Sequence, residues 1–128
     1  MYKHHLYKYT VATHSVSVRK GAIKLKTLKL ALEYRCFPIW VYDEQDTLMA
    51  NDSPEEIKTN KEMDDKLILL QEKYNNLFID DGVHFQYIGF KNTSDKQSLE
   101  NSIREIYVEI KSLIKDTYQI ENLITLQA

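Results

Sequence analysis

The side chains best suited to metal binding are few and scattered along this sequence. The histidines are His4, His5, His14 and His84, and Cys36 is the single cysteine. A structural zinc site needs four Cys or His ligands at close spacing, and a catalytic zinc site needs three. The sequence offers no such spacing, so we predict no metal site and no cofactor.

Cys36 could act as a nucleophile only beside a histidine and an orienting carboxylate. The residues around it, 34–40, are mainly aromatic and apolar, and Arg35 is the one neighbour that would favour a thiolate. In apolar surroundings a thiol packs as a small hydrophobic group and is unreactive. We therefore interpret Cys36 as a core residue and predict a protein without catalytic residues, not an enzyme.

Carboxylates gather in two predicted turns. Asp43, Glu44 and Asp46 lie in the first turn, and Asp80 and Asp81 precede a glycine in the second. The first turn lacks the alternating ligands and terminal glutamate of a calcium loop, and Asp-Asp-Gly is ordinary turn chemistry. Because turns lie at the ends of a sheet and can reach a partner, these carboxylates are our candidate partner-binding residues.

The net charge of −2 conceals an asymmetry along the chain. Residues 1–35 carry eight Lys or Arg and one Glu, whereas residues 36–128 carry nine Lys or Arg and eighteen Asp or Glu. Cations interleaved with tyrosines, as in the first segment, are typical of nucleic-acid surfaces, although lysines on an edge strand also prevent unwanted pairing. The candidate nucleic-acid contacts are Lys3, Lys8, Arg19, Lys20 and Lys24.

Length and composition predict one domain. A chain of 128 residues with 43% hydrophobic residues can bury a core without disulfides. We predict a single α+β domain over residues 1–128, in which residues 1–30 form a basic, extended N-terminal region of strands or an arm. The sequence contains neither a run of ~18 apolar residues nor a signal peptide, and its lone cysteine suits a reducing compartment. We therefore expect a cytoplasmic protein that does not contact a membrane.

The first half of the chain predicts three strands and a helix. Leu28, Leu30 and Leu32 alternate as in a strand, although residues 25–32 would also place three leucines on one helical face. Residues 38–50 indicate a strand, a polar turn and a second strand. Ser53 is the predicted cap of a helix that starts at Pro-Glu-Glu and runs to about residue 77, with a break near residue 60.

The second half predicts a strand, a helix and a final strand. Val83, Phe85 and Tyr87 alternate along the first strand. Ser94 is the predicted cap of an amphipathic helix from residue 95 to about residue 116, and residues 118–126 form the last strand. The predicted fold is a largely antiparallel sheet of four to six strands with two amphipathic helices on one face.

Residues 30–56 resemble small bacterial proteins in which one hairpin precedes a Pro-Glu-Glu helix, and residues 76–81 continue the likeness. The short, acidic, Lys/Ile/Asn-rich chain is similar to immunity proteins of bacterial toxin systems over residues 28–120. The resemblance implies a non-enzymatic protein-binding domain that blocks a cognate basic toxin by occluding its active site. The alternative is a small nucleic-acid-binding regulator that acts through the basic N-terminal region.

Overall fold

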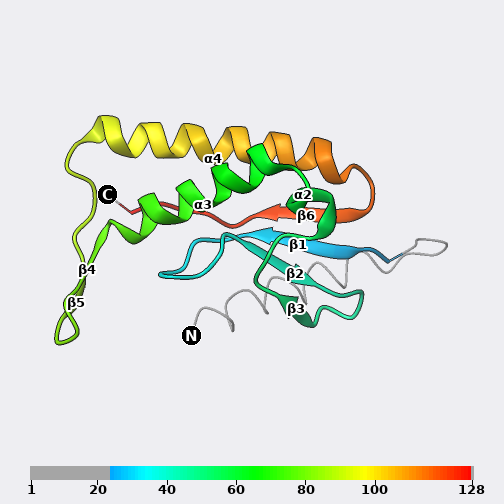
Figure 1. The fold of residues 1–128 in the computed structure, drawn as a ribbon, viewed down its shortest axis with the longest axis horizontal. Coiled ribbons are helices and arrows are strands. Elements are labelled where there is room, and N and C mark those ends of the chain that lie inside the picture. The colour runs from blue at the N-terminus through cyan, green and yellow to red at the C-terminus, as the bar shows by residue number, and fades with distance from the viewer. Residues whose placement is uncertain (1–23, 128) are drawn as a thin grey trace.

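A four-stranded sheet with two long helices on one face forms the body of the protein (Figure 1). A computed structural model describes residues 24–127. The strands are β1 (Lys26–Leu30), β2 (Ile39–Tyr42), β3 (Leu48–Ala50) and β6 (Tyr118–Asn122), in the order β3-β2-β1-β6. β2 is antiparallel to both β1 and β3, whereas β6 is parallel to β1. The predicted α+β fold is confirmed, with one parallel pair in a mostly antiparallel sheet.

Alternation along the strands separates two buried faces. Leu28 and Leu30 of β1 pair with Val41 and Ile39 of β2 on the face that the helices cover. The residues between them, including Lys29, are directed to the opposite face, because successive side chains of a strand alternate. Residues 26–30 are therefore a strand, and the helical alternative for this segment is wrong.

The helices begin at different residues from those predicted. α2 (Glu55–Lys58) starts after Pro54 and has no side-chain cap, and Ser53 is buried instead. The predicted break near residue 60 is confirmed, because the side chain of Asn60 accepts a hydrogen bond of 2.9 Å from the Met63 amide and so starts α3 (Lys61–Asn75). α2 has already ended with Thr59 as its C-cap, so the Asn60 side chain caps the start of a second helix.

The last helix, α4 (Thr93–Ile114), is capped by Asn92 rather than Ser94. The Asn92 side chain accepts a hydrogen bond of 2.8 Å from the Asp95 amide, which places Ser94 inside the first turn. The predicted apolar stripe is confirmed, and its buried members are Leu99, Ile103, Ile106, Ile110 and Ile114. No helix in residues 24–127 is long and apolar enough to span a membrane.

A separate hairpin projects from the end of α3 (Figure 1). It consists of β4 (Phe78–Asp80) and β5 (Phe85–Tyr87), which pair only with each other among the described strands. The strand predicted around residue 85 is therefore present, but it lies outside the main sheet. We call residues 78–87 the acidic hairpin.

Candidate protein-binding surface

The two acidic turns lie at opposite ends of the molecule (Figure 1). Asp43, Glu44 and Asp46 lie in the turn between β2 and β3, whereas Asp80 and Asp81 lie at the tip of the acidic hairpin. The structure thus divides the five predicted partner-binding residues into two sites. Each turn is therefore a separate surface.

In the β2–β3 turn, the side chain of Asp43 accepts hydrogen bonds from the backbone of the same turn. Its Oδ1 accepts hydrogen bonds of 2.9 Å from the amides of Gln45 and of Thr47. Asp46 has a φ of 64° and is buried, which was not expected of a turn carboxylate. Burial raises the pKa of Asp46, and the positive charges of Lys24 and Lys29 oppose that rise. Asp46 is therefore poorly placed to contact a partner, whereas Asp43 and Glu44 are half-buried.

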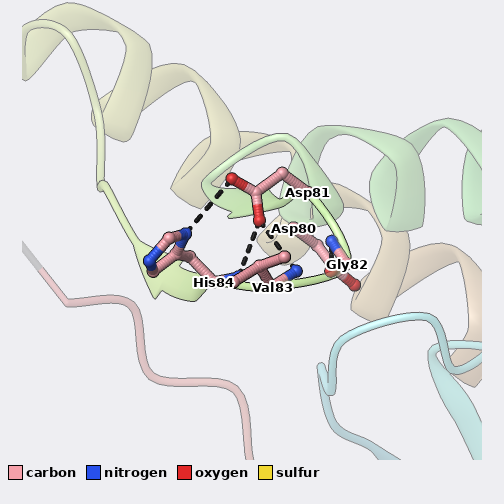
Figure 2. A network of polar contacts seen from close by, with 5 residues as sticks. All are labelled: Asp80, Asp81, Gly82, Val83 and His84. Atoms are coloured by element: carbon pink, nitrogen blue, oxygen red, sulfur yellow. Dashed lines mark hydrogen bonds and ion pairs between the residues drawn. The ribbon is translucent and has the colours of Figure 1, made fainter.

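At the hairpin tip, one carboxylate organises the whole turn (Figure 2). Asp81 Oδ1 accepts hydrogen bonds from the amides of Val83 at 3.0 Å and His84 at 2.6 Å, and its Oδ2 lies 3.4 Å from His84 Nδ1. These amide hydrogen bonds, first that of His84, hold the pKa of Asp81 below its ordinary value. Asp80 accepts one hydrogen bond of 3.2 Å, from the Gly82 amide. The tip therefore presents carboxylates on a turn of defined shape.

The acidic hairpin also exposes apolar side chains that the sequence reasoning did not assign to a surface. Val83 at the tip is 83% exposed and Phe85 is 57% exposed. Ile79, on the other face of the hairpin, and Ile88, just beyond it, are each about half exposed. Alternation alone suggests that Val83, Phe85 and Tyr87 enter a core. One feature of the sequence could have indicated this surface: residues 75–90 contain no lysine or arginine. Edge strands usually carry such charges, which prevent unwanted pairing with other chains.

One face of the hairpin is held by aromatic rings of the body. The ring of Phe78 lies 5.0 Å from that of Tyr34 and 5.3 Å from that of Tyr74, and Phe85 stacks on Phe78 at 5.3 Å. Tyr34 lies in the turn between β1 and β2, and Tyr74 lies in the last turn of α3. Aromatic pairs at these separations each stabilise by roughly 0.5–1.5 kcal/mol beyond their area. These contacts fix the direction in which the hairpin projects.

The segment that carries Tyr34 is itself tied to α3. The amide of Arg35 donates to Asn75 Oδ1 at 2.9 Å, and the side chain of Gln71 donates to the carbonyl of Glu33 at 2.9 Å. Arg35 has a φ of 58°, so the chain reverses sharply at this point. The base of the hairpin therefore rests on a braced turn rather than on a loose loop.

The family model described as Serratia CdiI immunity protein-like matches residues 26–123, which include every strand and helix from β1 to β6. The chain belongs to this family. No match was found among curated proteins.

CdiI immunity proteins belong to contact-dependent inhibition systems, in which they bind and neutralise a cognate CdiA toxin. They are inhibitors and not enzymes, which confirms the predicted absence of catalysis. The expected partner of this CdiI-family chain is therefore a protein toxin. The match begins at residue 26, so it leaves out most of the basic N-terminal region.

The structure places some of the remaining candidate residues and leaves others outside the described part of the chain. Lys3, Lys8, Arg19 and Lys20 lie outside the described residues. Lys24 is half-buried, and its positive charge opposes the rise in the pKa of Asp46. Cys36 is half-buried and packs against the cluster of Ala31, Trp40 and Tyr42, so it lies at the edge of the core rather than inside it. His84 is largely exposed. Within residues 24–127 no group of three His, Cys, Asp or Glu is placed to hold a metal ion.

Proposed function

We propose that this CdiI-family protein neutralises its toxin by covering the toxin's active site with an acidic surface. The observation that carries the proposal is the charge of the family-matched region. Residues 26–123 contain all nineteen carboxylates of the chain but twelve of its seventeen Lys and Arg side chains. A toxin that acts on an anionic substrate such as a nucleic acid has a cationic active site, to which this surface is complementary.

Electrostatic complementarity has two expected effects. It raises the rate at which the two proteins meet, and it makes that rate fall as salt is added. It also favours the substrate cleft over other parts of the toxin, because cations gather where an anionic substrate binds. CdiI-family proteins are typically cytoplasmic, and we propose the same location for this chain.

Competition between the immunity protein and the substrate tests occlusion directly. The cognate toxin, inactivated at its catalytic residue, is titrated with a labelled substrate analogue in the presence and absence of the immunity protein. Occlusion predicts that the apparent Kd of the analogue rises in proportion to the concentration of immunity protein. A complex that still binds the analogue at full affinity would exclude occlusion.

The salt dependence of association tests the electrostatic part separately. Stopped-flow association rates at several salt concentrations should fall steeply for the wild-type pair. A rate that does not change with salt would remove charge from the mechanism while leaving the competition result intact.

A further inference from the structure

We propose that the acidic hairpin is the element that enters the toxin's cleft. Val83 and Phe85 would contact an apolar floor of the cleft, and Asp80 would face the cations that line it. This inference rests on the proposed function and names the surface that performs it. The proposed partner is thus a cleft of the cognate toxin that is lined by cations, has an apolar floor and is deep enough to hold one hairpin tip.

The first support is the concentration of exposed apolar groups. Of the eight large hydrophobic residues exposed in residues 24–127, four lie between residues 79 and 88. Apolar side chains that gather on a protein surface commonly serve in binding. One of the four, Ile88, also lines a cavity of about 350 Å³ at the base of the hairpin, together with Leu77 and Phe90. Exposed apolar side chains are therefore present both at the tip of the hairpin and at its base.

The second support is that the hairpin contributes little to the stability of the body of the protein. A two-stranded hairpin is marginally stable by itself, and this one adds no strand to the main sheet. Residues 79–86 are all exposed, so they contribute little to the core. The aromatic contacts of Phe78 and the Asp81 turn nevertheless keep the hairpin ordered. An ordered projection that adds little to folding is suited to binding, because a preformed contact loses less entropy when the complex forms.

The third support is the sign of its charge. From residue 75 to residue 90 the only Asp, Glu, Lys or Arg side chains are Asp80 and Asp81, so the formal charge of the projection is entirely negative. Asp81 is engaged by backbone amides, whereas Asp80 accepts a single hydrogen bond from Gly82. Asp80 is therefore the carboxylate better placed to meet a cation. Apolar contacts flanked by such a charge match the composition of interface cores and their rims.

The β2–β3 turn is the weaker candidate by the same measures. Its Asp46 is buried, and Met49 is the one large hydrophobic residue of that hairpin that is exposed. This turn therefore serves as an internal comparison for the acidic hairpin. A variant there changes charge at the opposite end of the same molecule.

A matched pair of substitutions tests the inference. Val83→Arg places a cation and a long side chain at the hairpin tip, and Val108→Arg makes the same change at a site on α4 that is 65% exposed. Neither side chain is part of the buried core, so both variants should fold, which circular dichroism and thermal melting would verify. Binding to the catalytically inactivated cognate toxin is measured by calorimetry. Glu44→Arg, in the β2–β3 turn, provides the third variant.

The inference predicts that Val83→Arg raises the Kd by at least about 30-fold, the loss typical of an interface hot spot. Val108→Arg and Glu44→Arg should stay within about twofold, since sites outside an interface change binding little. Equal losses in all three variants, or a loss confined to Glu44→Arg, would overturn the inference. Full binding by Val83→Arg would overturn it as well. Failure of the wild-type protein to compete with substrate would instead overturn the proposed function.

Discussion

The ring of Tyr34 meets the ring of Phe85 edge-on, with their centres 4.9 Å apart. Tyr34 lies in the turn that joins β1 to β2, and Phe85 lies in the acidic hairpin, which is not part of the main sheet. Through this contact the turn between two central strands sets the position of the acidic hairpin. The aromatic cluster is therefore where changes in the body should reach the proposed binding surface.

Removal of the Tyr34 ring should loosen the acidic hairpin without unfolding the body. Tyr34→Ala removes two ring contacts, to Phe78 and Phe85, each worth about 1 kcal/mol. Amide hydrogen exchange across residues 78–87 should accelerate, while exchange in α4 stays unchanged. Tyr34→Phe keeps the ring and is the control. Equal acceleration in both variants would show that the ring contacts do not hold the hairpin.

Gly82 should be required for the shape of the tip. Its φ of +85° is unfavourable for a residue with a Cβ atom, and no neighbouring atom lies within 4 Å of the position where that Cβ would be. Gly82→Ala should therefore destabilise the turn by about 1 kcal/mol through backbone strain alone. Faster amide exchange at the tip is the readout, and Gln86→Ala in the same hairpin is the control. Unchanged exchange in Gly82→Ala would show that the turn adopts another conformation.

The tip should depend on pH through Asp81. The folded-state pKa of Asp81 lies below its ordinary value because amides of His84 and Val83 donate to the ionised carboxylate. Ionisation therefore stabilises the turn fully above the ordinary pKa of 3.8, and that stabilisation is lost as the pH falls through the lower folded-state value. The amide NMR shifts of Val83 and His84 should report this transition, and it should vanish in Asp81→Asn. A midpoint above 3.8 would contradict the predicted direction.

Lys29 and Glu121 should stabilise the sheet as a pair. They are opposite each other in the parallel β1–β6 register, with Lys29 Nζ 3.8 Å from Glu121 Oε1 and 4.4 Å from the centre of the Tyr42 ring. Lys29→Met keeps the aliphatic stem but leaves the partly buried Glu121 carboxylate without its cation, so the free energy of unfolding should fall.

A double-mutant cycle measures the coupling of this pair. Adding Glu121→Gln to Lys29→Met removes the carboxylate that has lost its cation, so the double variant should recover part of the lost stability. Urea unfolding of the four proteins provides the measurement. Strictly additive losses would mean that the two charges do not interact.

The sequence was sufficient to predict which side chains of the main strands and helices are buried, but not which strands pair with one another. Alternation of Leu28 and Leu30, and the apolar stripe of α4, specify which side chains are buried. They do not specify partners, so the parallel pairing of Lys26 with Tyr118, far apart in the chain, was not predicted. The same limit hid the pairing of Phe78 with Tyr87, because periodicity assigns a face and not a sheet.

For the candidate surface, the positions of both turns were predictable, whereas their chemistry was only partly so. Asp and Gly at residues 80–82 indicate a turn by themselves. The burial of Asp46 depends on its positive φ and on packing against distant strands, neither of which a local pattern contains. The exposure of Val83 and Phe85 is likewise a property of the tertiary structure.

The parallel pairing of β6 with β1 has a consequence for the timing of protection. β1 lies near the start of the described chain and its neighbour β6 near the end, so the sheet cannot be completed until residue 122 has left the ribosome. Pairings between such distant segments also form slowly. A partly translated polypeptide therefore lacks the complete sheet. Protection by this CdiI-family protein requires molecules that have been translated through residue 122 and have folded.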